Sequence, residues 1–140
     1  MLTGYNLKAR LYRKAIVSIE AGSVKLATWS LSVFGGSVLI ILGDSYLRPS
    51  NAHHRLTYLL FLIGWASIGW SMYHGFKITR HTMVLDLHST NENTLTAILQ
   101  KCNASFASQL KWFQRGLLVF AVWLIFYLIW WIGTDIPKPK

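Results

Sequence analysis

Three long apolar segments without a charged side chain dominate the pattern of this sequence. They cover residues 26–43, 56–76 and 116–133, and none of them contains Asp, Glu, Lys or Arg. At about 1.5 Å per residue, a helix over each segment has roughly the length that crosses the hydrocarbon core of a bilayer. The pattern therefore predicts an all-α membrane protein with three transmembrane helices.

The composition favours the same class and a single domain. The chain has 140 residues, of which 53% are hydrophobic and 14% are charged. A soluble domain of this composition would have too few charges to cover its surface, and the length allows one domain only. Around the three spans we expect an N-terminal segment (1–23), an outer loop (44–55), a connecting segment (77–115) and an outer tail (134–140).

The N-terminal segment combines an apolar stripe with basic residues. Leu7, Leu11, Ala15 and Ile19 recur at helical spacing. Four basic residues lie mostly off that stripe: Lys8, Arg10, Arg13 and Lys14. We predict a basic amphipathic helix that lies on the inner leaflet and contacts anionic lipid. Two alternatives remain open: topogenic charges on an unstructured tail, and an organellar transit peptide, because no acid occurs before Glu20.

The distribution of the 14 Lys and Arg residues predicts the orientation. Ten of them precede the first span or lie between the second and third, whereas four lie in the first loop and the tail. By the positive-inside rule, the N-terminus and the segment 77–115 face the cytoplasm, and the C-terminus lies outside. Membrane insertion and anionic lipid account for the net charge of +9, so we expect no nucleic-acid partner.

The connecting segment 77–115 is long and patterned. It lacks proline, and its one strong turn signal is the polar run 89–93. The helix of the second span should continue to about His88, and Asn91 or Asn93 can cap a new helix that leads into the third span. We therefore predict a cytoplasmic helical hairpin formed by extensions of the second and third spans.

The second arm of this hairpin carries a near-heptad apolar stripe. Its members are Leu95, Leu99, Cys102, Phe106, Leu110 and Phe113. The opposite face should carry Gln100, Lys101, Asn103, Ser108, Gln109 and Lys111. The first arm offers too few apolar residues to cover the whole stripe, so we interpret it as the assembly surface for another copy or a partner.

Small residues on the spans predict where helices approach each other closely. The first span repeats Thr28, Ser32 and Gly36 at four-residue spacing, and the second carries Gly64, Ser67, Ser71 and Gly75. The third span has almost no small residues, and Phe120, Trp123, Phe126, Tyr127, Trp130 and Trp131 make it bulky nearly all round. Its aromatic surface either faces lipid or docks on a larger membrane protein.

His74, His81 and His88 recur every seven residues and raise the question of a metal or haem site. Seven residues bring a helix back to the same face but about 10.5 Å further along its axis, which is too far for one metal ion. We therefore expect interfacial or packing roles for the histidines, no metal site and no cofactor. The single cysteine, Cys102, excludes an internal disulfide.

The sequence offers no catalytic pattern. No charged residue lies within a span to mark an ion path, and no serine–histidine–acid, paired-carboxylate or phosphate-loop motif is visible. The layout resembles that of small prokaryotic membrane proteins that act as oligomeric effectors, immunity or exclusion factors, or accessory subunits, an analogy of architecture without a shared motif. We expect a non-catalytic subunit or scaffold of a membrane complex in the bacterial inner membrane, or in an organellar one. A homo-oligomeric pore and an immunity or exclusion protein are the alternatives.

Overall fold

The computed structural model describes residues 2–42, 59–87 and 92–135, and all of them are helical. The helices are α1 (Leu2–Leu42), α3 (Leu59–Leu87) and α4 (Glu92–Asp135). The predicted all-α class is thus confirmed. The predicted outer loop (44–55), His88 and the last five residues lie outside the described residues.

Two of the three helices are long and apolar enough to cross a membrane, judged by length and composition alone. These are α1, within Leu7–Ile40, and α4, within Glu92–Trp130. Among the described residues, α3 does not meet the same criterion. Its apolar segment includes Ser67, Ser71 and His74, which lower its mean hydropathy.

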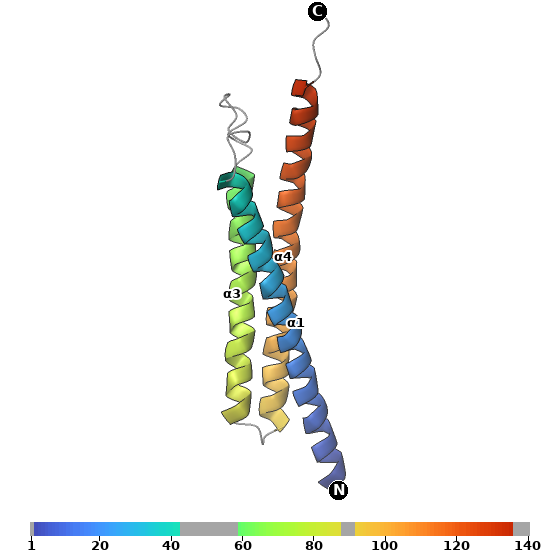
Figure 1. Ribbon diagram of the computed structural model, residues 1–140. Helices are drawn as coiled ribbons and strands as arrows, with labels where there is room; N and C mark the ends of the chain where they lie inside the picture. Colours follow the sequence, from blue (N-terminus) through green and yellow to red (C-terminus); the bar gives the residue numbers. More distant parts are fainter. Residues whose placement is uncertain (1, 43–58, 88–91, 136–140) are drawn as a thin grey trace, which may run out of the picture.

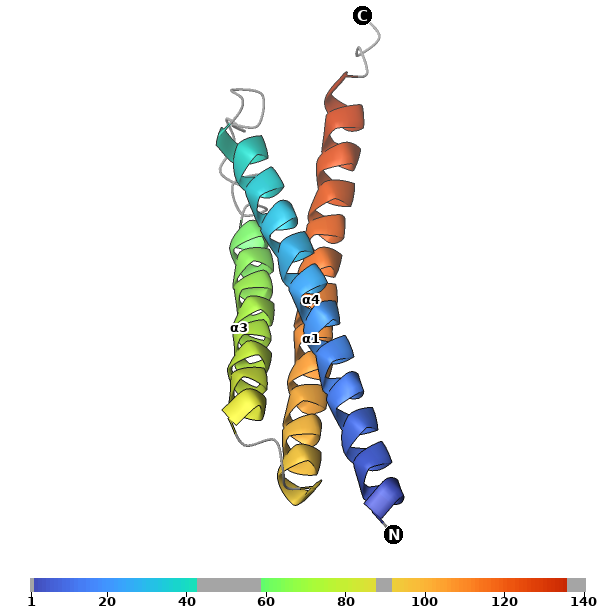
Figure 2. The ribbon, with the colours of Figure 1, turned by 60° about the horizontal axis from the view of Figure 1, so that its bottom comes forward.

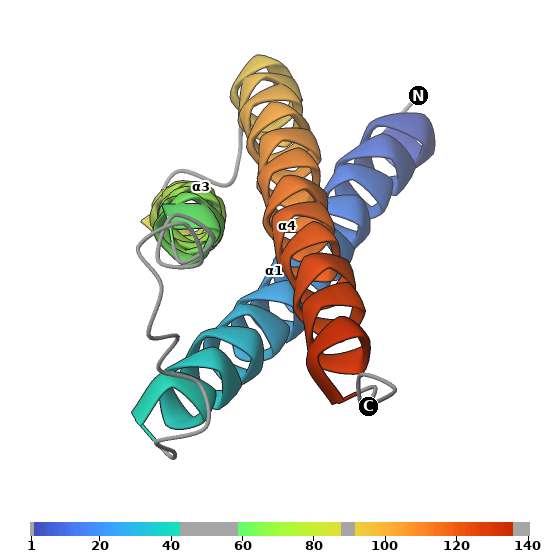
Figure 3. The ribbon, with the colours of Figure 1, turned by 90° about the horizontal axis from the view of Figure 1, so that it is seen from above.

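The helices form an elongated bundle without a sheet in its described part. Helices α3 and α4 run antiparallel and lie side by side, while α1 runs obliquely across the pair (Figures 1 and 2). Viewed along α3, α1 and α4 cross each other (Figure 3). Both α3 and α4 continue without a break through the regions predicted as span and hairpin arm.

Heptad spacing on each helix explains why these three helices pack together. Steps of three and four residues connect the buried or half-buried positions, which keeps them on one face of a helix. On α1 the positions are 9, 12, 16, 19, 23, 26, 30, 33 and 37; on α3 they are 61, 64, 68, 71, 75, 78 and 82. On α4 they are 95, 98, 102, 106, 109, 113, 116, 120, 123, 127 and 130, with one irregular step.

The structure corrects the prediction of a separate N-terminal helix. Helix α1 is continuous for 41 residues, so the basic segment is the first half of the same helix that contains the first predicted span. Ile16 is fully buried there against α3 and α4, whereas Leu7 and Leu11 of the predicted stripe are exposed. The stripe that faces the bundle in this segment passes instead through Ala9, Tyr12, Ile16 and Ile19.

The core has two apolar layers. We call the first the lower core: Ile16 from α1, Ile78 from α3, and Leu95, Ile98 and Cys102 from α4. The second, the upper core, consists of Leu26, Ile68 and Phe113, one from each helix. The C-terminal end of α3 and the N-terminal end of α4 lie together at the lower end, and the predicted spans lie around and above the upper core (Figure 1).

The surface changes character along the bundle. In the lower half of the bundle, which contains the lower core, the basic residues of all three helices are exposed: Lys8, Arg10, Arg13, Lys14, Lys77, Arg80 and Lys101. In the upper half, the exposed side chains are large and apolar: Trp29, Leu31, Leu39, Leu62, Ile63, Leu118, Ile125, Phe126 and Ile129. The buried residues of that half include Ser30, Ser37, Ser67 and Ser71. The upper half therefore exposes many large apolar side chains and buries several hydroxyl groups beside its apolar core, which is unusual for a water-soluble bundle.

Candidate functional site

A polar site lies between the two apolar layers, where all three helices meet. We call it the polar crossing and define it by Ser23 on α1, Ser71 and Gly75 on α3, and Gln109 on α4. Ser23 Oγ donates a hydrogen bond to Gln109 Oε1 at 2.7 Å, and Gln109 Nε2 donates to the Ser23 carbonyl at 3.2 Å. Ser71 Oγ donates to the Gln109 carbonyl at 2.8 Å. One glutamine thus connects α4 to both neighbouring helices.

Gly75 gives the carboxamide its space. A Cβ atom at this position would lie 2.8 Å from Gln109 Nε2, closer than such atoms approach in folded proteins. Ser23, Ser71 and Gln109 are buried, and Gln109 is 0% exposed. Because both ends of the amide are hydrogen bonded, the crossing avoids the cost of an unpaired polar group in the core. It contains no group that titrates near neutral pH. Its hydrogen bonds therefore serve to connect the three helices.

The sequence analysis placed Gln109 on the outer face, and the structure corrects this. The core positions of α4 are Ile98 and Gln109, whereas the predicted stripe had Leu99 and Leu110 in their place. At the second of these positions the prediction selected the more apolar residue, Leu110, which is the rule for a bundle in water. A strict three-four spacing from Cys102 and Phe106 would have found Gln109.

The residues of the predicted assembly surface pack against other helices of the same chain. Leu95, Cys102 and Phe113 are buried, and Leu99 and Phe106 pack half-buried against the lower core. Only Leu110 is exposed. The stripe is covered because the first half of α1 packs on it, for example Gly22 against the Phe106 ring. It therefore offers few free apolar side chains to another protein.

The two predicted small-residue stripes differ in their surroundings. Gly64, Ser67, Ser71 and Gly75 of α3 are all buried, and a Cβ at Gly64 would lie 2.7 Å from Phe120 Cζ. Close approach of α3 and α4 depends on such contacts.

The other stripe, Thr28, Ser32 and Gly36 of α1, faces outward. A Cβ at Gly36 would meet nothing within 4 Å. Thr28 and Ser32 instead donate hydrogen bonds to carbonyls one turn earlier in α1, so their hydroxyls have partners without a neighbouring helix.

The aromatic third span has two different sides. Trp123 is buried, and its ring centroid lies 4.4 Å from that of Phe61 on α3; Phe120 packs against the same ring at 5.5 Å. Trp123 also stacks on Tyr127. Phe126 is exposed, and the side chain of Trp131 lies outside the described residues. One edge of this helix therefore packs within the bundle, and the opposite edge is open.

Near the lower core, Glu20 accepts a hydrogen bond from Thr82 Oγ1 at 2.9 Å. Burial, together with the nearby Glu20 carboxylate, raises the pKa of the Cys102 thiol. Burial and the neighbouring cations Lys101, Arg80 and Lys77 lower the pKa of His81. The thiol is thus kept protonated and the imidazole neutral, which does not favour nucleophilic catalysis by Cys102.

The histidines do not form a metal centre in the part of the chain that the structure describes. No group of three or more His, Cys, Asp or Glu side chains lies close enough there to hold a metal ion. The Nδ1 atom of His74 is enclosed without a hydrogen-bond partner, and the His74 ring lies beside Trp70 and Tyr73.

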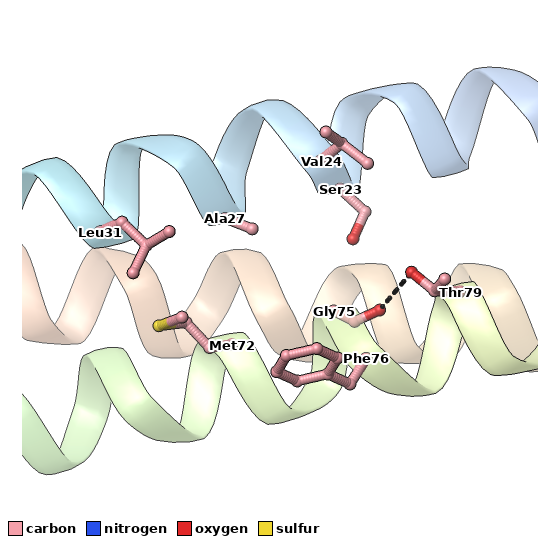
Figure 4. A pocket seen from close by; sticks show the side chains of 8 residues that line it. All are labelled: Ser23, Val24, Ala27, Leu31, Met72, Gly75, Phe76 and Thr79. Carbon is pink, nitrogen blue, oxygen red and sulfur yellow. Dashed lines mark hydrogen bonds between the residues drawn. The ribbon is translucent and has the colours of Figure 1, made fainter.

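An open pocket of about 150 Å³ lies between α1 and α3, beside the polar crossing (Figure 4). Its lining is Ser23, Val24, Ala27 and Leu31 from α1, and Met72, Gly75, Phe76 and Thr79 from α3. Thr79 Oγ1 donates a hydrogen bond to the Gly75 carbonyl (Figure 4). The Ser23 hydroxyl donates its hydrogen bond to Gln109. No side chain of this lining titrates, so the pocket suits an apolar occupant.

No protein-family model, curated protein or solved structure matches this chain.

Proposed function

We propose that the chain is a three-span membrane protein that serves as a non-catalytic subunit or scaffold of a membrane complex. The exposed apolar surface of the upper half carries this proposal. In water, residues such as Leu62, Ile63 and Phe126, which are 53–56% exposed, would each lose about half of the roughly 1.5–3 kcal/mol that full burial provides. In a bilayer the same surface is in its preferred solvent.

We propose that α3 also spans the membrane, although its length and composition alone do not identify it as a span. The polar residues of its upper half, Ser67 and Ser71, face the bundle, and their hydroxyls donate to backbone carbonyls. Its outward residues include Leu59, Leu62 and Ile63, which are exposed. A helix that hides its polar side chains in this way can span lipid although its average composition is only moderately apolar.

The proposed topology follows the charges. The exposed basic residues of the lower half support a cytoplasmic N-terminus and hairpin, because anionic lipids of the inner leaflet attract such residues. The four residues proposed for the lipid interface, Lys8, Arg10, Arg13 and Lys14, are exposed on α1. The upper halves of α1, α3 and α4 then form the spans.

Assembly is proposed to use the outer face of α1 within the membrane. Thr28, Ser32 and Gly36 leave a shallow surface on which the helix of a partner can approach closely, gaining dispersion contacts that lipid matches poorly. The hairpin stripe is less suited to this role, because most of it is covered within the chain. A pore is less favoured, because Ser30, Ser37, Ser67 and Ser71 are buried inside one bundle.

Native mass spectrometry of the complex extracted in mild detergent tests this function. A hetero-complex is expected; a closed homo-oligomer would favour the pore, and a monomer the immunity or exclusion alternative. Gly36→Leu should dissociate the complex. Gly69→Leu is the matched control, because Gly69 is also exposed with nothing within 4 Å of its added Cβ. Equal effects of both substitutions would exclude the outer face of α1.

A further inference from the structure

A second group of side chains, on the seam of α3 and α4, combines aromatic rings with cations. We call it the interfacial cluster: Trp70, Tyr73 and Lys77 on α3, and Trp112 and Arg115 on α4. The rings of Trp70 and Trp112 meet across the seam with centroids 6.3 Å apart. Trp70 also contacts Tyr73 at 5.5 Å. The cluster is therefore one continuous surface formed by two helices.

The two cations are held over ring faces. Lys77 Nζ lies 4.7 Å from the centre of the Tyr73 ring, and the Arg115 guanidinium carbon lies 4.8 Å from the centre of the Trp112 ring. Such contacts orient a cation but leave its charge in place. Neither helix has Asp or Glu between residues 59 and 85 or between residues 93 and 134. The cluster is thus an electropositive surface with no acidic residue in the adjacent turns of its own helices.

Its position along the bundle is that of the inner membrane interface. Lys77 directly follows the apolar segment 56–76, and Arg115 directly precedes the segment 116–133. Ile63 lies seven residues before Trp70, and Val119 lies seven residues after Trp112, so each shares a helix face with its tryptophan. Ile63 is exposed and Val119 is half-buried. An apolar track thus leads from the cations into the predicted membrane.

We propose that the interfacial cluster binds the headgroup phosphate of an anionic phospholipid of the inner leaflet, with its acyl chains along Ile63 and Val119. Arg115 can donate two parallel hydrogen bonds to a phosphate, and Lys77 supplies a second positive charge. Trp70, Tyr73 and Trp112 fit the headgroup level, which favours amphipathic rings. A lipid is favoured over free phosphate because the apolar track continues from the charges. This proposal rests on the membrane location proposed above.

The test uses the full chain, purified in mild detergent and titrated with phosphatidylglycerol, phosphatidylcholine or inorganic phosphate, with bound species counted by native mass spectrometry. Phosphatidylglycerol should bind in preference to phosphatidylcholine, and inorganic phosphate should not displace it. At about 1 kcal/mol for each cation near an anionic surface, Lys77→Gln with Arg115→Gln should reduce this preference about 30-fold. Lys25→Gln with Lys111→Gln is the matched control, since both residues are exposed cations near the same interface outside the cluster.

The charge-conserving pair Lys77→Arg and Arg115→Lys should keep most of the preference, which separates loss of charge from loss of folding. If the control pair reduced the preference for phosphatidylglycerol equally, the preference would arise from the general surface charge, and the proposal would be overturned. Three other results would also overturn it. The first is the absence of any preference for phosphatidylglycerol, and the second is its displacement by inorganic phosphate. The third is the loss of a protein partner in the cluster variant without a change in lipid binding. If alkaline carbonate released the wild-type chain from membranes, the proposed function itself would fail. If the chain stayed embedded but showed no preference, only this inference would fail.

Discussion

Replacing Gly75 with alanine should destabilise the bundle, whereas the same change at Gly69, earlier on α3, should not. The new methyl group at Gly75 would lie 2.8 Å from Gln109 Nε2 and 3.4 Å from Ser23 Oγ. The carboxamide cannot move away without losing the hydrogen bonds that join α4 to α1. At Gly69 the methyl group would meet nothing within 4 Å.

The size of the effect follows from the difference between the two sites. Both substitutions gain helix propensity of up to about 1 kcal/mol, which cancels in the comparison. Overpacking at Gly75 costs about 1–3 kcal/mol, and two interhelical hydrogen bonds contribute about 0.6 kcal/mol each in a membrane protein. Gly75→Ala should therefore be about 2–4 kcal/mol less stable than Gly69→Ala.

Unfolding by sodium dodecyl sulfate in mixed micelles, followed by circular dichroism, gives the two free energies. A double-mutant cycle of Gly75→Ala with Gln109→Ala adds a second readout, because the shorter side chain removes the clash. The pair should be more stable than the sum of the single effects predicts. Equal stabilities of Gly75→Ala and Gly69→Ala, or strict additivity in the cycle, would refute the role assigned to the polar crossing.

Three further outcomes are expected. Because burial and nearby cations lower the pKa of His81 below its unfolded value of about 6.5, stability should be constant above that pH and fall as the pH drops towards the folded-state pKa. His81→Gln should weaken this dependence, and an unchanged pH profile would contradict the assignment. Cys102 should react with a maleimide only after unfolding, because its thiol is buried and its pKa is raised; rapid reaction in the folded protein would contradict its core position. The purified protein should show no haem absorbance and no stoichiometric transition metal, and a metal lost in His81→Ala would show that ligands combine between helices or chains.

The class and the extent of two helices were predictable from local signals. The polar run 89–93 predicted an interruption after about His88; α3 ends at Leu87, and α4 begins at Glu92, within the run. The continuity of the hairpin arms with the spans followed from the absence of proline. Such features depend on neighbouring residues only, which a single sequence displays directly.

The packing faces were harder to predict because the sequence analysis treated polarity as a guide to exposure. That rule holds in water, and it misplaced Gln109. In this bundle polar side chains such as Ser23 and Gln109 form hydrogen bonds between helices, whereas Leu110 is exposed. The heptad spacing of α1 was present in the sequence but was interrupted by serines. The coverage of the hairpin stripe by α1 is a long-range contact that local spacing does not show.

The most direct test of the membrane account compares two cysteines on the outer face of α3. In a Cys102→Ala background, Leu62→Cys and Met83→Cys replace side chains that are similarly exposed in the isolated chain, at 56% and 65%. Reaction with N-ethylmaleimide, which reaches both sides of a vesicle, is measured in proteoliposomes and again after unfolding in detergent. The account predicts that Met83→Cys reacts readily in the vesicles, while Leu62→Cys, surrounded by hydrocarbon, reacts only after unfolding. Equal labelling rates of the two cysteines in intact vesicles would contradict it.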